Sequence, residues 1–417
     1  MTGENICPPK ADRPPAAPGS RRSTMTQREV VVIGAGLLGA ATAFQLARRG
    51  LEVLVIESDD INSGASGRNA GSLHFQLEPR MADALRAQPD QLARLLPVSL
   101  QAIEDWRRID EDIGDVGVGQ AGGLLLGETA TDEALLERKV ELENRHGLRT
   151  ELVAGSELRQ LAPYLSSRVR VASHCRYEGH ADPLRVTPAY VRASQGLGVE
   201  YWQLTQVDGI AKVGAGFQLR VTREHAPGDA RAEIVRARRI VIAAGAWSQP
   251  LAAQLGVKLD IVPAALTMNV TERTSLLIPH LVQHMGRKLS LKQTEAGNLL
   301  IGGGWPALLH WSGRAKGMDS ANTLPQALIG NLRVARDVVP AIASLRLLRS
   351  WTGIASDTPD HLPVCGPLPG VSDAFIVGAS SSFTLGPTLA AALAEIMVNG
   401  QSRLDLRHCD PARVLLH

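Results

Sequence analysis

The stretch from residue 30 to residue 57 constrains the fold of this chain more than any other. Residues 30–33 are apolar and β-branched, as in a buried parallel strand, and residues 37–49 have the spacing of a helix that Gly50 would close. A second apolar strand at 53–56 ends at an acid. Strand, glycine loop, helix, strand and acid together form the βαβ context of a dinucleotide-binding fingerprint. We therefore expect an α/β fold with a Rossmann-like domain.

Three glycines and one acid in this unit have distinct expected roles. Gly34 allows the tight turn after the strand, Gly36 lets the backbone approach a pyrophosphate, and Gly39 lets the helix pack closely on the sheet. Glu57, about 20 residues further on, can accept hydrogen bonds from ribose hydroxyl groups and disfavours a 2′-phosphate. The alternative is a glycine-rich turn without a ligand, and the complete βαβ context argues against it. The unit alone leaves FAD and NAD both open.

Length and charge limit the remaining possibilities. The chain has 417 residues, more than one simple core usually accommodates, so we expect two domains. Its net charge of +2 gives no indication of nucleic-acid binding, and no apolar run is long enough to span a membrane. Residues 1–24 are rich in Pro, Ala, Ser and Arg, which predicts a disordered tail, and Met25 is a candidate natural start.

The cysteines are scattered and form no CxxC pair. We therefore expect no disulfide framework, no metal site and a reducing, cytoplasmic location. The four cysteines are Cys7, Cys175, Cys365 and Cys409.

Two later segments repeat the pattern of a strand followed by a small polar loop. Residues 240–243 predict a strand that runs into Ala244 and Gly245, where small residues allow a cofactor to approach closely. Residues 375–377 predict a strand before the loop 378–387, and the helix that follows would direct free N–H groups towards a ligand.

Other segments allow more than one interpretation. The loop 58–72 is small and polar, and His74 follows it directly, where a structural and a catalytic role are equally open. Short strands are expected at 216–222 and 234–236 as parts of a meander, and residues 131–145 predict a charged, exposed helix.

Taken together and in this order, these blocks resemble the family of FAD enzymes that includes glycine oxidase, sarcosine oxidase and D-amino-acid dehydrogenase. The resemblance extends from Arg28 to Pro411. Within the family, the stretch 292–306 and the run NAGSLHFQ are most similar to the flavin subunits of opine and D-hydroxyproline dehydrogenases. The blocks that carry the resemblance are VVVIGAGLLGAATAFQLARRG, ESDDINSGASGRNAGSL, IVIAAGAWS, WTG, TPDHLPVCGP and FTLGP.

The resemblance implies two interleaved domains. A Rossmann-like FAD-binding domain would comprise residues 25–114, 183–258 and 346–417. A smaller substrate domain with an antiparallel sheet, of the α+β kind, would comprise residues 115–182 and 259–345.

The resemblance also implies bound FAD. We expect non-covalent FAD, because the usual positions of covalent attachment carry neither Cys nor His. Val207 would pair its backbone with adenine, and the last loop would stabilise the negative charge of the reduced flavin. The implied cofactor-binding residues are Gly34, Gly36, Leu38, Gly39, Glu57, Ser58, Ser66, Arg68, Asn69, Ala70, Gly71, Val207, Ala244, Gly245, Trp247, Phe383, Thr384, Leu385 and Gly386.

Two departures from the family concern the substrate. Relatives of glycine oxidase carry Gly-Leu-Arg-Pro where this chain has Gly-Ile-Ala-Ser at 353–356, and they carry Arg or Lys near the position of Thr384. Both usual anchors for a substrate carboxylate are therefore missing. The candidates in their place are His74 and Lys292 as catalytic residues, and Gln76 and Ser382 as substrate-binding residues.

The implied function is oxidation of a C–N bond in an amino acid or secondary amine, such as a D-amino acid, D-hydroxyproline or an opine. The substrate would give a hydride to flavin N5, and a dehydrogenase is favoured over an oxidase. The chain could also be the flavin subunit of an electron-transfer assembly, or an oxidase of a 2-hydroxy acid. A tRNA-modifying or purely structural flavoprotein is a further alternative, and the lack of a basic patch argues against RNA.

Overall fold

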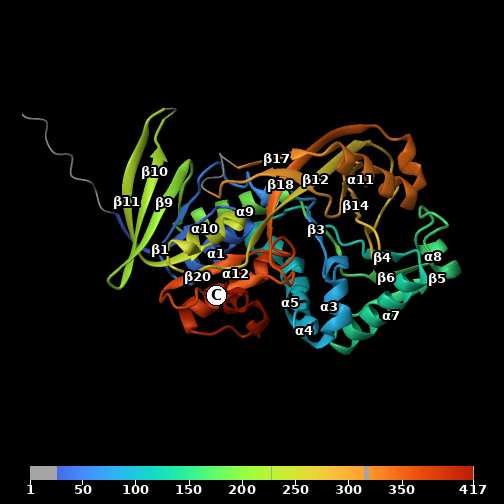
Figure 1. Cartoon of the computed structure of the whole chain (residues 1–417), viewed down its shortest axis with the longest axis horizontal. Coiled ribbons are helices and arrows are strands. Elements are labelled where there is room, and N and C mark those ends of the chain that lie inside the picture. Colours follow the sequence, from blue (N-terminus) through green and yellow to red (C-terminus); the bar gives the residue numbers. More distant parts are fainter. Residues whose placement is uncertain (1–25, 227, 314–318, 417) are drawn as a thin grey trace, which may run out of the picture.

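The structure is a computed structural model that describes residues 26–226, 228–313 and 319–416. The expected tail at 1–24, Met25 and Cys7 lie outside the described residues. Two eight-stranded sheets organise the rest of the chain, one at each side of the view in Figure 1. The other three cysteines are free and buried.

The first sheet contains the βαβ unit expected from the sequence. Six of its strands follow the order β19-β20-β11-β1-β2-β8, and all neighbours in this path are parallel except β19 and β20. These strands are β1 (Thr26–Ile33), β2 (Val53–Ile56), β8 (Glu200–Trp202), β11 (Ala230–Ile242), β19 (Val364–Pro367) and β20 (Ala374–Gly378).

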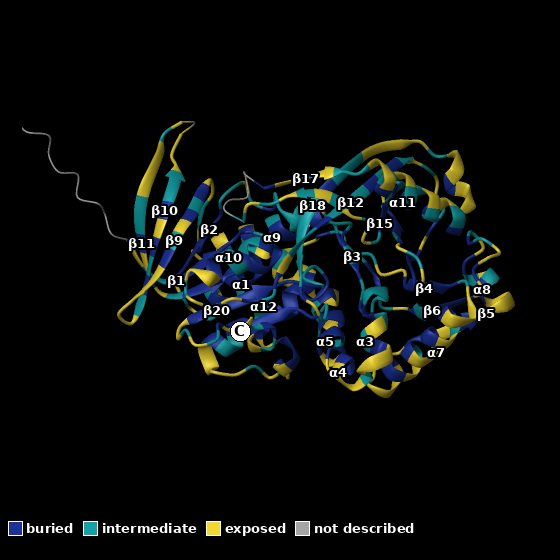
Figure 2. Cartoon of the chain, in the orientation of Figure 1, coloured by how far each residue is buried: buried dark blue, intermediate teal, exposed yellow. Residues whose placement is uncertain are grey.

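Strand β1 is buried on both faces, as its continuous apolar run predicts. Val30 and Val32 pack in the core formed with the helices, whereas Val31 and Ile33 pack in a second core on the opposite face. Figure 2 shows α1 and α12 largely buried beside this sheet. The helices of the first core include α1 (Leu37–Ala47), α5 (Leu96–Arg107), α9 (Pro183–Gln195) and α12 (Gly386–Asn399).

Strand β11 corrects one expectation from the sequence. The strands expected at 234–236 and 240–243 form one continuous strand, which also pairs with the meander strand β10. The charged residues between them do not break the strand, because the Arg239 guanidinium donates hydrogen bonds to Glu29 at 2.8 Å and to the Met397 carbonyl at 3.0 Å. The meander projects at the left of Figure 1 and consists of β9 (Thr205–Val213), β10 (Gly216–Glu224) and the start of β11.

The second sheet is antiparallel apart from one parallel pair, β13 and β4. Its order is β18-β12-β15-β14-β13-β4-β6-β5. In chain order the strands are β4 (Gly123–Gly127), β5 (Glu151–Ala154), β6 (Val171–Cys175), β12 (Val262–Arg273), β13 (Leu281–His284), β14 (Ser290–Gln293), β15 (Asn298–Gly302) and β18 (Leu347–Asp357).

Edge strand β18 connects the second sheet to the loop after β2. The indole N–H of Trp351 donates to the Arg68 carbonyl at 2.8 Å, and Arg68 Nη1 donates to the Thr352 carbonyl at 3.3 Å. The proposed domain boundary at 346 therefore lies just before a strand that contacts both regions.

The remaining elements are short or peripheral. The helices are α2 (Ala65–Arg68), α3 (Ala82–Ala87), α4 (Pro89–Ala93), α6 (Ile109–Ile113), α7 (Ala130–Arg145), α8 (Gly155–Leu161), α10 (Ser248–Ala253) and α11 (Pro325–Val338). Short 3₁₀ helices occupy Pro79–Met81, Gly245–Trp247, Pro340–Ser344, Arg407–Cys409 and Pro411–Val414. Two small sheets pair β3 (Ser72–Leu73) with β7 (Gly179–His180) and β16 (Ala307–His310) with β17 (Ser320–Thr323). Within the described ranges, no helix has the length and apolar character needed to cross a membrane.

Candidate active site

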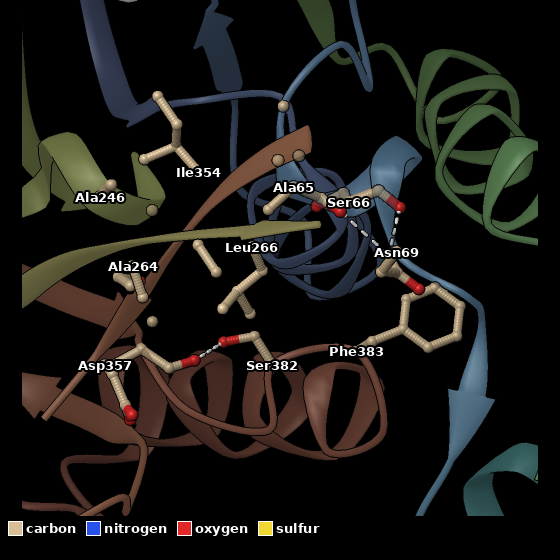
Figure 3. Close-up of a pocket in the computed structure, with 18 of the residues that line it drawn as sticks. Ala65, Ser66, Asn69, Ala246, Ala264, Leu266, Ile354, Asp357, Ser382 and Phe383 are labelled. Atoms are coloured by element: carbon tan, nitrogen blue, oxygen red, sulfur yellow. Dashed lines mark hydrogen bonds between the residues drawn. The ribbon is translucent and has the colours of Figure 1, made fainter. Parts of the chain in front are cut away.

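One cavity of about 1270 Å³ runs from the glycine loop of the first sheet to the second sheet. Its wall is formed by segments that are far apart in the sequence, from Ile33 to Thr384. Figure 3 shows side chains from α2, β12, β18 and the loop before α12 around the same space. This volume exceeds the usual range for a drug-sized ligand, so the cavity can hold a large ligand and a smaller one together.

The three glycines at the start of the cavity have the roles that the fingerprint requires. Gly34 has φ +106°, and a Cβ there would lie 2.5 Å from the Ala243 carbonyl oxygen. A Cβ on Gly39 would lie 1.9 Å from the Gly34 carbonyl oxygen, so a side chain would separate helix and strand. A Cβ on Gly36 would meet only the Ser66 side chain, at 2.9 Å. Gly34 and Gly39 thus shape the loop, whereas Gly36 keeps open space beside it.

The N-terminus of α1 faces this space. Its N-cap residue, Gly36, provides no side-chain cap, and the Leu37 N–H donates to Ser66 Oγ at 2.9 Å. Helix N-termini bind phosphates because the first N–H groups and the helix dipole both favour negative charge. The cradle therefore suits a pyrophosphate, and α1 and its loop would hold that part of a dinucleotide.

Glu57 is fixed beside the glycine loop. Its Oε2 accepts a hydrogen bond from the Ala35 N–H at 2.8 Å, and its Oε1 accepts from the Asp59 N–H at 3.0 Å. The carboxylate is on the cavity wall next to Ser58. The backbone thus holds an acceptor where ribose hydroxyls are expected.

The loop after β2 is held by its own side chains. Asn69 Nδ2 donates to the Ala65 and Ser66 carbonyls, and its Oδ1 accepts from the Gly71 N–H at 2.6 Å. Asn69 therefore fixes the loop against α2 while it lines the cavity. Gly71 itself is not on the wall. It packs against the backbone of Ala181, and a Cβ on Gly71 would lie only 2.0 Å from the Ala181 carbonyl oxygen.

Most of the other expected cofactor residues also lie on the wall. Trp247 is held there by a 2.8 Å hydrogen bond from its indole N–H to Asp319. Leu385 and Gly386, like Gly39, lie behind the wall: the Leu385 N–H donates to the Ser381 carbonyl at 3.0 Å, and Gly386 packs on Leu37. The expected residues on the wall are Gly34, Gly36, Leu38, Glu57, Ser58, Ser66, Arg68, Asn69, Ala70, Val207, Ala244, Gly245, Trp247, Phe383 and Thr384.

His74 lies on the cavity wall next to the loop before α12. Its backbone N–H donates to Thr384 Oγ1 at 3.1 Å, and its buried Nδ1 has no hydrogen-bond partner among the described residues. Burial lowers the pKa of His74 to about 4, with Arg80 and Lys292 adding to the shift. The imidazole is therefore neutral near pH 7, so it can accept a hydrogen bond but does not supply a positive charge.

Lys292 lies on β14 close to this wall but not on it. Ser290, two residues earlier and thus on the same face of the strand, does line the cavity. Burial lowers the pKa of Lys292 from 10.5 to about 7, although Asp182 opposes the shift. An alkylammonium group is thus disfavoured in this region.

Gln76 belongs to a buried polar network and is not on the cavity wall. Its Nε2 donates to Glu178 at 2.8 Å, and its Oε1 accepts from Lys139 at 2.7 Å and from Ser173 at 3.0 Å. Lys139 also forms a 2.8 Å ion pair with Glu143, and both side chains are fully buried. The amide of Gln76 is thus engaged within the protein, which leaves it no role in direct substrate contact.

This network also corrects the expectation of an exposed helix at 131–145. Helix α7 carries Lys139 and Glu143 on a buried face, where they support the segment after His74. The Leu77 N–H donates to Glu143 at 2.7 Å.

Ser382, the other expected substrate residue, is on the cavity wall, and its hydroxyl donates to the Ala379 carbonyl.

A cluster of charged residues near His74 was not identified from the sequence. Glu78, Arg80, Asp357 and His361 all line the cavity and contact one another directly or in series. The only signal in the sequence is the Glu-Pro-Arg run shortly after His74. Asp357 and His361 come from the other end of the chain, so their approach was not visible there.

Comparisons with known proteins agree with this site. The model of the FAD dependent oxidoreductase family (DAO) matches residues 29–396. A subunit of opine oxidase from Rhizobium meliloti is 27% identical over 388 residues, which cover 92% of this chain and 96% of that protein. Glycine oxidase from Geobacillus kaustophilus is 24% identical over 387 residues, covering 92% of this chain and 96% of that protein.

Solved structures show the same fold. L-proline dehydrogenase from P. horikoshii superposes with a TM-score of 0.80 at 25% identity, covering 93% of this chain and 98% of that one. The crystal structure of Geobacillus kaustophilus glycine oxidase gives a TM-score of 0.78 at 22% identity, covering 93% and 99%. The chain therefore belongs to the DAO family of FAD-dependent oxidoreductases, with FAD as its cofactor.

Proposed function

We propose that this enzyme oxidises the C–N bond of an amino acid or secondary amine and passes the electrons to a partner protein rather than to oxygen. The observation that carries the proposal is the continuous cavity that joins the dinucleotide cradle to the buried wall at His74. When bound, FAD supplies the two-electron acceptor for the substrate hydride. The chain positions both ligands and excludes water.

The His74 wall suits an amine that must be neutral to react. An amine gives up its α-hydride with help from the nitrogen lone pair, which an ammonium group lacks. Burial keeps His74 uncharged and lowers the pKa of Lys292, an alkylamine in the same region, to about 7. The same burial favours the neutral form of a substrate amine, while Nδ1 of His74 can accept a hydrogen bond from it. In this proposal His74 contacts the substrate. Lys292 affects the substrate only indirectly, through its electrostatic effect on His74.

The names of two relatives support partner subunits, and the name of one structural neighbour supports a dehydrogenase. The opine oxidase relative and the HcnC relative from hydrogen cyanide synthase are both named as subunits of those enzymes. L-proline dehydrogenase is named for a dehydrogenase reaction. Non-covalent binding of FAD is part of the proposal, and release of intact FAD on denaturation tests it.

The test is anaerobic reduction of the purified yellow holoenzyme. The panel contains D-amino acids, L- and D-proline, hydroxyprolines, N-methyl amino acids, opines and, as a contrast, 2-hydroxy acids. We expect an amine to bleach the flavin absorbance, turnover with an artificial dye to exceed turnover with oxygen, and denaturation to release intact FAD. If only 2-hydroxy acids reduced the flavin, the substrate would be an alcohol and not an amine. Rapid turnover with oxygen would exclude the proposed electron transfer to a partner.

A further inference from the structure

The wall around His74 contains one guanidinium group that is firmly held yet incompletely bonded. Arg80 Nη2 donates to Glu78 Oε1 at 2.8 Å and to Ser381 Oγ at 2.5 Å. Arg80 Nη1 has only a 3.6 Å contact with Asp357 Oδ1. Arg80 Nε is buried and has no hydrogen-bond partner among the described residues. The side chain is thus oriented through Nη2, and Nη1 is the group left to bind a ligand.

The neighbouring carboxylates are bonded more completely. Asp357 Oδ1 accepts from the Thr358 N–H at 3.0 Å and from the Ser380 hydroxyl, and Asp357 Oδ2 lies 2.7 Å from His361 Nδ1. Glu78 Oε1 also accepts from Ser381 Oγ at 2.8 Å. The cluster therefore orients Arg80 and leaves its Nη1 donors unused, while Asp357 is shared with His361.

Other cations at the cavity are less suitable as anchors, and Lys288, which also lines the wall, lies at an exposed position. Arg68 donates to the Ser63 and Thr352 carbonyls in the cofactor half. Arg287 is paired with Glu128 and Asp337. His74 is neutral, and Lys292 lies off the wall.

We propose that Arg80 is the anchor for a substrate carboxylate, so that the substrate is an amino acid rather than a simple amine. This inference rests on the proposed function and adds the residue that selects the substrate class. Guanidinium groups bind carboxylates through paired N–H donors, and Arg80 lines the same cavity as His74. Arg80 takes the role that Ala355 and Thr384 cannot fill, because both lack a charge.

The test measures binding without turnover. Pyrrole-2-carboxylate is a planar analogue of a cyclic amino acid that cannot form an imine by losing an α-hydride, and pyrrole-2-carboxamide is its uncharged counterpart. Titration of each into the holoenzyme is followed by the change in the visible flavin spectrum. We expect wild type to bind the carboxylate at least about tenfold more tightly than the amide. Arg80→Gln should weaken carboxylate binding by about tenfold to a hundredfold and leave amide binding unchanged.

Two further variants separate this role from a structural one. Arg80→Lys keeps the charge and should restore part of the preference for the carboxylate. Arg86→Gln removes an arginine on α3 that is paired with the exposed Asp83, and it should behave as wild type. FAD content should stay normal in all variants.

Several outcomes would overturn the inference. These are equal wild-type affinity for the two analogues, an unchanged carboxylate affinity in Arg80→Gln, or loss of FAD from that variant, which would make Arg80 a cofactor residue. The proposed function is tested separately, by flavin reduction with amines and by turnover with a dye compared with oxygen. Carboxylate binding that depends on Arg80 would remain valid if those tests failed.

Discussion

The two ends of the cavity offer different kinds of chemical groups to their ligands. At the glycine loop, the binding surface is largely main chain: the N-terminus of α1 and the N–H groups that fix Glu57. At the His74 end, the surface consists of side chains, several of them ionised, with Arg80 and Asp357 among them. Main chain suits a ligand part that is the same in every FAD, whereas side chains can be exchanged to suit a substrate. The glycine-loop end thus suits the invariant cofactor, and the His74 end can determine which substrate binds.

The strongest test of this contrast removes the buried ion pair behind the His74 end. In Lys139→Met, Glu143 would remain as a fully buried carboxylate without its cation. Breaking such a pair costs about 3–5 kcal/mol of the free energy of unfolding. We expect the urea midpoint of the FAD-saturated protein to fall accordingly. Lys258→Met, at an exposed position, should change it by less than about 0.5 kcal/mol. An unchanged midpoint in Lys139→Met would mean that the side-chain end does not depend on this network.

A smaller effect is expected at the main-chain end. In Gly36→Ala the new Cβ would occupy space beside α1 but would meet only the Ser66 side chain of the protein, and the φ of −73° is compatible with alanine. We expect FAD to bind about tenfold to a hundredfold more weakly, with little change in the stability of the apoprotein. Titration calorimetry with FAD measures the first effect, and urea unfolding without FAD the second. Gly196→Ala, at the end of α9 with φ −60° and off the cavity, serves as the control. Normal FAD affinity in Gly36→Ala would show that the main chain at Gly36 does not contact FAD.

A third expected effect is a pH dependence at the His74 end. Burial raises the pKa of Glu178 from 4.5 to about 8, so the folded protein holds this proton more tightly than the unfolded chain. The contribution of Glu178 to stability therefore falls as pH rises from about 4.5 to about 8. We expect the stability of wild type relative to Glu178→Gln to decrease over this interval. Melting temperatures of both proteins with saturating FAD measure it, and a constant difference would show that Glu178 is already ionised when folded.

The sequence made the first end of the cavity predictable because its parts are consecutive. The strand–loop–helix–strand unit and Glu57 lie within one short stretch, and the structure has them where the fingerprint requires. The second end depends on contacts between distant segments. Gln76 is engaged by Lys139 and Glu178, and no periodicity in the sequence reveals that pairing.

The same reason explains why Arg80 was missed. Its partners Asp357 and Ser381 lie about three hundred residues further along the chain, so the sequence gives no sign that they meet. Helix α7 was expected to be exposed because charged residues usually face solvent. Lys139 and Glu143 can be buried only because they are buried together as an ion pair.

The position of β20 in the first sheet has a consequence for how the enzyme is made in the cell. β20 pairs with β11, and the cavity wall continues through the loop after it to Thr384. A nascent chain lacks this strand and wall until most of the 417 residues have left the ribosome. FAD can therefore find a complete site only after the segment up to Thr384 has been synthesised. Chains released early would carry an open first sheet with an unpaired edge of β11, a surface that chaperones recognise and that favours aggregation.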